Sequence, residues 1–271
     1  MAARGGDVAH DRTAEDYAAR LLALRRAGQP FTSVFDGGPV PDLPFAYEVQ
    51  KHFVDGLAEG RPRAGYKVGL TSPRMQAMSG VDQPIAGVVL AERLHHSPAS
   101  VAAADFIRLG VECEVAVRIG PNFPVDDPGR LDLAAVPGCL DAVAAAFELI
   151  DDAAADYSRL KAASLVADNV WNAGLVIGEP VAPSAVADFA DIDGVLRRDG
   201  EAIDKGSSRD VLGSPLKVVL WLAAELLRNG GRLAAGDWVT TGSMAPTRFV
   251  KPGERYVFTL TDLPPVALNI R

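Results

Sequence analysis

Two glutamates, two residues apart, stand in the most informative stretch of the sequence, which runs from Gly110 to Ile119. Apolar residues fill every second position there, and this alternation predicts a β-strand with one buried face. Glu112 and Glu114 then project together from the other face. Carboxylates this close repel each other unless solvent or a cation lies between them. The pair is therefore either part of a solvated strand face or two oxygen ligands for a hard divalent cation such as Mg²⁺ or Mn²⁺.

A third glutamate favours the metal interpretation. Glu148 comes directly after an apolar run that we predict to be a helix from about Leu140 to Phe147, and Leu149 and Ile150 follow it. A carboxylate in such surroundings is expected to be partly buried and to need a partner. That partner is either a salt-bridging side chain or a shared cation. Three carboxylates around an octahedral metal ion would leave coordination positions open for a bidentate substrate.

Two further segments have residues that could do chemistry. Lys67 is a lone lysine in an apolar strand bounded by Gly65 and Gly69. Such a lysine either reaches the surface or acts as an acid, a base or an anion clamp. The small residues from Thr240 to Ser243 follow a predicted strand and could offer backbone N–H groups to a carboxylate, although an ordinary turn fits equally well. The sequence contains no nucleotide-binding glycine motif, zinc motif or nucleophile elbow, and its four histidines form no ligand set.

The composition excludes several classes of function. The 271 residues include 35 acidic and 27 basic side chains, for a formal net charge of −8. Such a chain has no broad basic face for nucleic acid. Its two cysteines, Cys113 and Cys139, cannot form a disulfide scaffold, and the apolar run from Val218 to Leu227 is too short to cross a bilayer. Because we find no secretory signal, we expect a cytoplasmic protein that binds neither nucleic acid nor membranes.

The elements that must position these residues fall into two parts. We expect a helical segment over residues 1–64, with frayed residues up to Arg12. One helix should begin after an N-cap at Thr13, and a second helix should lie around Ala46 to Glu59. Residues 65–271 predict a catalytic domain of short strands, with a hairpin at Asp199-Gly200 and a helix after Ser214-Pro215. No regular βαβ alternation is present, so the fold class is α+β. The clearest predicted strands are Tyr66–Leu70, Gly87–Leu90, Val111–Ile119, Leu175–Ile177 and Trp238–Thr241.

An ordered set of short motifs resembles the 2-keto-4-pentenoate hydratase / 4-oxalocrotonate decarboxylase family of the fumarylacetoacetate hydrolase superfamily. The resemblance covers the chain from about Phe45 to Gly253. It implies a mixed β-roll of the fumarylacetoacetate hydrolase C-terminal type, preceded by helices and assembled as a homodimer or a higher homo-oligomer. The matching motifs are Gly65–Ser72, Gly80–Pro84, Glu112-x-Glu114, Phe147–Asp151, Asp168-Asn169, Val211–Pro215, Trp221–Ala223 and Gly236-Asp237 leading into Thr241–Ser243.

The resemblance also implies roles for individual residues. Family members hold Mg²⁺ or Mn²⁺ with an E-x-E pair and a later acidic residue, which match Glu112, Glu114 and Glu148. The active-site lysine of the family falls on Lys67, and the aspartate of its G-V-D-Q-P motif falls on Asp82. The residues implied in substrate binding are Leu70, Thr71, Ser72, Gln83, Asp168, Asn169, Thr241, Gly242 and Ser243.

The activity implied by this resemblance is hydration of a 2-hydroxy-2,4-dienoate, or of its 2-oxo-alkenoate tautomer, in the meta-cleavage catabolism of aromatic compounds. Lys67 and Asp82 are the candidates for proton transfer and water activation. Decarboxylation of a 4-oxalocrotonate-type acid is the alternative, and it would need a second cationic contact at the far end of the substrate. A third possibility is a chain that binds a 2-oxo acid without turnover, or a partner subunit, since family enzymes associate with one another.

Two departures from the family pattern lie close to these motifs. Asp152-Ala153 replace a frequent Ser-Arg, which removes a possible basic contact. Val170-Trp171 replace the usual Ala-Ser after Asp168-Asn169, and Trp171 would narrow the pocket if it faced the site.

Overall fold

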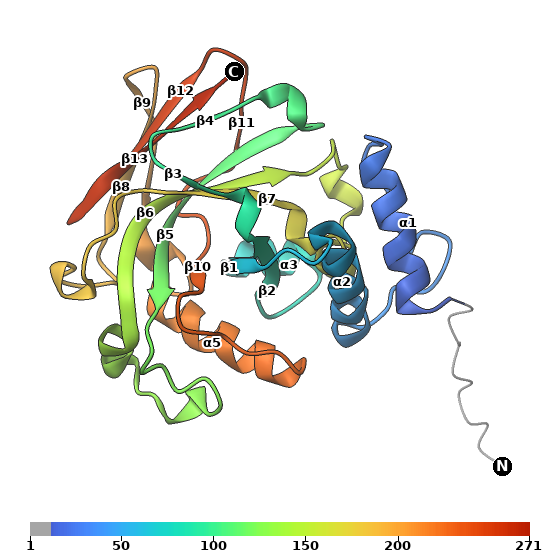
Figure 1. Ribbon diagram of the computed structural model, residues 1–271. Coiled ribbons are helices and arrows are strands. Elements are labelled where there is room, and N and C mark those ends of the chain that lie inside the picture. The colour runs from blue at the N-terminus through green and yellow to red at the C-terminus, as the bar shows by residue number, and fades with distance from the viewer. Residues whose placement is uncertain (1–11) are drawn as a thin grey trace.

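Two helices at the N-terminus, α1 (Ala14–Arg26) and α2 (Leu43–Ala58), precede a chain that is mostly β-strand. The computed structural model describes residues 12–271; residues 1–11, most of the stretch predicted to be frayed, lie outside the described residues. Figure 1 shows α1 and α2 on one side of the molecule and the C-terminal strands on the other. None of the helices in the described part is long and apolar enough to cross a membrane. The other helices are α3 (Pro73–Ser79), α4 (Ala162–Ala167) and α5 (Pro215–Arg228).

The strands form two sheets that pack face to face. An eight-stranded sheet has the order β2-β1-β10-β5-β6-β7-β3, with β11 paired to β5, and a five-stranded sheet has the order β4-β13-β12-β8-β9. The larger sheet contains β1 (Arg63–Gly69), β2 (Ile85–Leu90), β3 (Leu94–His96), β5 (Leu109–Ile119), β6 (Leu140–Asp151), β7 (Asn172–Ile177), β10 (Trp238–Thr240) and β11 (Arg248–Phe249). The smaller contains β4 (Ala99–Val101), β8 (Asp193–Arg198), β9 (Glu201–Ser207), β12 (Arg255–Leu260) and β13 (Leu263–Ile270).

The larger sheet is curled into a half-barrel, as Figure 1 shows, and its two faces differ in composition. One face packs against the smaller sheet and contributes large apolar side chains to the main core. The inner face of the half-barrel contains small residues in its two central strands, namely Ala116 of β5 and Ala142, Ala144 and Ala146 of β6. Because these side chains fill little space, the sheet can curl tightly around them. The mixed α+β half-barrel with preceding helices confirms the predicted fold class.

The predicted helix from Leu140 to Phe147 is wrong, because these residues belong to the strand β6. β6 lies between β5 and β7 and is antiparallel to both. Its two faces are both buried, Val143 and Phe147 in the main core and the alanines inside the half-barrel. A strand buried on both faces reads as a continuous apolar run, and its alanines favour a helix in isolation. Only the neighbouring strands decide between the two.

Local signals predicted several of the other elements, although the short helices α3 and α4 were not predicted. Thr13 and Asp16 form the capping box at the start of α1. The turn at Asp199-Gly200 joins β8 to β9, which are paired antiparallel. Ser214 caps α5 through its side chain. These features depend on residues close in sequence, which is why the sequence shows them.

Gly87 of β2 shows how closely the strands approach the half-barrel interior. It lies opposite Lys67 in the antiparallel β1–β2 pair. A Cβ atom there would lie 2.7 Å from the Asn169 carbonyl oxygen and 3.1 Å from Cγ of Lys67. A side chain at this position would therefore displace either the loop after α4 or Lys67.

We expect Gly87→Ala to lower the free energy of unfolding by about 1–3 kcal/mol, because the added methyl group overpacks a site bounded by backbone. Denaturant unfolding would measure the change. Gly138→Ala is the matched control, since a Cβ atom at Gly138 meets nothing within 4 Å. Equal effects of the two substitutions would contradict this account of Gly87.

Candidate active site

Three glutamates meet on the inner face of the half-barrel. Glu112 and Glu114 lie two residues apart on β5, and Glu148 of β6 is the direct cross-strand partner of Glu112. One carboxylate oxygen from each glutamate lies within 4.8 Å of the others. Glu114 and Glu148 are 0% exposed, and Glu112 is half-buried. This burial excludes the solvated strand face that the sequence left open.

Lys67 reaches the cluster from a strand that does not pair with β6. Its Nζ lies 2.9 Å from Oε1 of Glu148, although β10 and β5 separate β1 from β6 in the sheet. Such a contact is possible because the sheet curls and the interior side chains of β5 and β6 are small. The ammonium group is 3% exposed, so the surface role that a lone lysine often has is excluded.

The electrostatics of the cluster keep Lys67 charged. Burial lowers the pKa of Lys67, but Glu148, Glu112 and Glu114 outweigh burial, and the pKa lies above its ordinary value. Burial is also the largest cause that raises the pKa of Glu148, to about 7, against the opposing effect of Lys67. Burial, followed by Glu148 and Glu112, raises the pKa of Glu114 well above its usual range. The site thus holds more negative charge than its own residues stabilise.

Neutral donors hold one oxygen of each glutamate. Gly242 donates its backbone N–H to Oε2 of Glu114 at 2.6 Å, and Thr247 donates its hydroxyl to Oε1 of Glu112. The side-chain amide of Asn172 donates to Oε1 of Glu148 at 3.1 Å. These contacts fix the carboxylates in orientation and leave their remaining oxygens directed elsewhere.

The remaining oxygens show that the residues fit a divalent cation. Among residues 12–271, no hydrogen-bond partner reaches Oε1 of Glu114 or Oε2 of Glu148, and both atoms are buried. Three carboxylates against the single ammonium of Lys67 leave two negative charges unmatched. Carboxylate oxygens are the ligands that Mg²⁺ and Mn²⁺ prefer. A cation bound by Glu112, Glu114 and Glu148 would match both the charge and the free oxygens.

Two residues predicted to bind substrate lie beside this cluster. Gly242 contacts Glu114 as described, and its φ of +109° suits glycine. A Cβ atom at Gly242 would lie 2.3 Å from Oγ1 of Thr71, so the Thr71 side chain packs directly on this glycine. Leu70, also with a positive φ, is half-buried next to Thr71, and its carbonyl oxygen accepts from the side chain of Gln76. A substrate-binding role for these residues stays a prediction.

Three other residues predicted to bind substrate make hydrogen bonds within the protein. The Ser72 hydroxyl caps α3. The Thr241 hydroxyl donates to the carbonyl oxygen of Val115, and the Ser243 hydroxyl donates to that of Ala245. These side chains therefore fix the ends of β1 and β10 in the structure. Their predicted contact with substrate stays a prediction.

The pair Asp168-Asn169 also makes structural contacts. Asp168 is buried and forms an ion pair with Arg25 of α1, with Nε of the arginine at 3.0 Å. The side-chain amide of Asn169 accepts from the backbone N–H of Val88 at 2.7 Å and donates to its carbonyl oxygen at 2.8 Å. The two residues thereby tie the loop after α4 to α1 and to β2.

Asp82 and Gln83 lie on the turn between α3 and β2. Asp82 is exposed and Gln83 is half-buried. Within the described residues, no hydrogen bond or ion pair joins either of them to Lys67 or to the three glutamates. The catalytic role predicted for Asp82 therefore stays a prediction.

Trp171 packs edge-on against Phe31 and Tyr157, with ring centroids 5.4 Å and 5.6 Å away.

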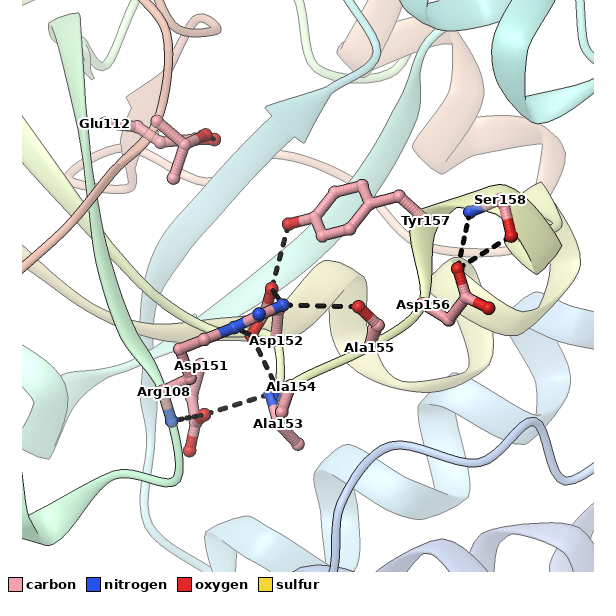
Figure 2. A network of polar contacts seen from close by, with 11 residues as sticks. Arg108, Glu112, Asp151, Asp152, Ala153, Ala154, Ala155, Asp156, Tyr157 and Ser158 are labelled. Carbon is pink, nitrogen blue, oxygen red and sulfur yellow. Dashed lines mark hydrogen bonds and ion pairs between the residues drawn. The ribbon is translucent and has the colours of Figure 1, made fainter.

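A network of polar contacts next to Glu112 was missed by the sequence analysis. Asp152 is completely buried and accepts from Nε of Arg108 at 2.7 Å and from the phenol of Tyr157 at 3.0 Å. Figure 2 shows the phenol oxygen between the carboxylates of Asp152 and Glu112. Burial, followed by the charges of Asp152 and Glu112, raises the pKa of Tyr157, so the phenol is neutral. The one signal in the sequence was that Asp152 departs from the family pattern.

We expect Mg²⁺ or Mn²⁺ to raise the Tm, because a cation that binds only the folded chain stabilises it by about 2.7 kcal/mol at a hundred times its Kd. Thermal unfolding with and without the metal salt would measure the shift. Glu114→Gln should lose most of it, whereas Glu225→Gln should keep it, since Glu225 is a buried glutamate of α5 outside the cluster. A wild-type Tm insensitive to both cations would contradict the metal site.

Two curated proteins are similar to this chain over most of its length. The 2-keto-4-pentenoate hydratase 2 of Dechloromonas aromatica (strain RCB) is 34% identical over 251 residues, which are 92% of this chain and 94% of the relative. The 2-oxo-hept-4-ene-1,7-dioate hydratase of Escherichia coli is 31% identical over 224 residues, which are 78% of this chain and 80% of that protein. Both names describe hydratases of unsaturated 2-oxo acids.

A solved structure shares the fold. The 4-oxalocrotonate decarboxylase of Pseudomonas putida G7, complexed with magnesium and adipate, superposes with a TM-score of 0.85 at 25% identity and covers 95% of this chain and 97% of its own. Residues 75–271 match the fumarylacetoacetate (FAA) hydrolase C-terminal family, and this match contains all three glutamates. The chain therefore belongs to the fumarylacetoacetate hydrolase C-terminal family.

Proposed function

We propose that the protein is a divalent-metal-dependent hydratase of a 2-hydroxy-2,4-dienoate or its 2-oxo-alkenoate tautomer. The observation that carries this proposal is the buried ammonium of Lys67 inside the cluster of Glu112, Glu114 and Glu148. The similarity to proteins named as hydratases over more than nine-tenths of the chain supports it. When bound, a divalent cation supplies a Lewis acid for the carboxylate and keto oxygens of such a substrate.

The reaction requires proton transfer in two places. Ketonisation of the dienol moves a proton from oxygen to carbon and gives a ketone conjugated to a double bond. Water then adds its oxygen to the β carbon and a proton to the α carbon. A group that can donate and recover a proton close to the substrate carbons serves both steps.

Lys67 is the residue of this chain placed for that role. It is buried beside Glu148 and stays charged, so it can donate a proton and can stabilise negative charge that develops on the substrate. We assign proton transfer to Lys67 rather than to Asp82 because Asp82 is exposed on the turn after α3. Activation of water by Asp82 is a separate part of the proposal.

Decarboxylation of a 4-oxalocrotonate-type acid is the second candidate function. The observation that favours it is the close structural similarity to a 4-oxalocrotonate decarboxylase, with a TM-score of 0.85. The two reactions use the same kind of electron sink at the 2-oxo acid end. They differ at the other end, where a decarboxylase substrate has a second carboxylate.

We expect Lys67→Met to lower kcat for hydration of 2-hydroxypenta-2,4-dienoate by about 10²–10⁴-fold, since it removes a general acid without adding bulk. Loss of the dienoate in the presence of Mg²⁺ would measure the rate. Lys51→Met, which alters an exposed lysine of α2, is the control and should leave kcat unchanged. The increase in Tm with Mg²⁺ should persist in the Lys67 variant because the three glutamates remain.

The same assay separates the candidate functions. Faster release of CO₂ from 4-oxalocrotonate than loss of the dienoate would favour the decarboxylase. Turnover of neither substrate, with metal and oxalate both bound, would favour a chain that binds 2-oxo acids without turnover. A Lys67 variant with wild-type kcat would remove Lys67 from the mechanism.

A further inference from the structure

The three glutamates of the cluster differ in their access to solvent. Glu114 and Glu148 are completely buried, whereas Glu112 is half-buried. Glu112 is therefore the carboxylate of the cluster that a ligand from solvent can reach. Figure 2 shows the phenol oxygen of Tyr157 between Glu112 and the pair formed by Asp152 and Arg108.

Arg108 is the cation of this network, and it forms an ion pair with Asp152. Nε of Arg108 donates to one oxygen of Asp152 at 2.7 Å and Nη2 donates to the other, so the pair is bidentate. Nη2 also donates to the carbonyl oxygen of Ala155 at 3.2 Å. The guanidinium lies over the ring of Phe249, 4.5 Å from its centroid, and the side chain is 36% exposed. Arg108 thus remains reachable, and Asp152 occupies the edge formed by Nε and Nη2, whereas no hydrogen bond joins Nη1 to another described residue.

Several contacts keep Asp152 in place as the partner of Arg108. It is 0% exposed and accepts hydrogen bonds from Arg108, from the phenol of Tyr157 at 3.0 Å and from the backbone N–H of Ala154 at 3.0 Å. A carboxylate with this many donors is held firmly in position. A carboxylate of a ligand would therefore meet a guanidinium whose charge Asp152 already neutralises.

We propose that Asp152 is a specificity-determining residue, which neutralises Arg108 at the entrance and so restricts the site to 2-oxo acids with a single carboxylate and an uncharged tail. The inference rests on the proposed function and specifies its substrate class. The second carboxylate of a dicarboxylate would approach Arg108, whose charge Asp152 already neutralises. An apolar tail would instead meet the rings of Tyr157 and Phe249. Asp152 acts through Arg108 and Tyr157, so it is a positioning residue.

The chain contains a matched pair that lies outside the site. Arg248 of β11 makes the same bidentate contact with Asp204 of β9. Arg248 is paired in register with Val111, whose side chain lies in the core between the two sheets. Its side chain is therefore on the face of the larger sheet opposite to the glutamates. Asp204→Asn frees an arginine there, whereas Asp152→Asn frees one at the entrance.

The experiment compares two ligands of equal length, 2-oxohexanoate and 2-oxoadipate, which differ in the second carboxylate. Calorimetric titration in the presence of Mg²⁺ gives the ratio of their Kd values for the full chain. Asp152→Asn should shift this ratio about tenfold toward 2-oxoadipate, because Arg108 becomes available to the added carboxylate. Asp204→Asn should leave the ratio unchanged. The turnover of 2-hydroxypenta-2,4-dienoate and of 2-oxohept-4-ene-1,7-dioate should change in the same direction.

A double variant keeps the proposal testable if Asp152→Asn does not fold. Asp152→Asn combined with Arg108→Gln removes both charges and leaves none buried alone, and its Kd ratio should equal that of the wild type. A tenfold loss of 2-oxoadipate affinity in the double variant would show that Arg108 already serves the ligand, and this would overturn the proposal. An unchanged ratio in a folded Asp152→Asn variant would overturn it as well. Absence of turnover in the wild type, with the shift in Kd intact, would contradict only the hydratase function.

Discussion

Glu112, Glu114 and Glu148 repel one another inside a curled sheet where two of them have no access to solvent, and the surrounding structure is arranged around this repulsion. Lys67 matches part of the charge, and Gly242, Thr247 and Asn172 hold one oxygen of each carboxylate. Two buried oxygens of the cluster have no partner among residues 12–271. A buried carboxylate oxygen without a partner is unfavourable, and a divalent cation bound there would match both the oxygens and the charge.

Other buried acids in the described residues show how different this cluster is. Asp152, Asp168, Glu225 and Asp237 each form an ion pair with an arginine. Two of these pairs, Asp152 with Arg108 and Asp168 with Arg25, flank the segment that leads from β6 to β7. They hold that segment against α1 and against the start of β5. Each of these four carboxylates thus has its own arginine, whereas the three glutamates share one lysine. The excess negative charge of the glutamates fits a divalent cation.

The curl of the larger sheet brings Lys67 to the three glutamates. Lys67 on β1 and Glu148 on β6 are not on neighbouring strands, and they meet across the interior. The alanines of β6 and the absence of a side chain at Gly87 leave the space that this contact needs. The same alanines made β6 resemble a helix in the sequence. A feature that misled the sequence analysis is therefore the one that allows the site to form.

The sequence by itself determined what depends on short-range pattern. The alternation from Val111 to Ile119 put Glu112 and Glu114 on one face, because successive strand residues point to opposite sides. Caps and hairpin turns, and the order of family motifs, were also readable. The tertiary structure decided the state of β6, the burial of the carboxylates, the contact of Lys67 with Glu148, and the partners of Asp168 and Thr241. It also placed Arg108 on Asp152. These features depend on strand register and on contacts between distant segments, and no local pattern encodes them.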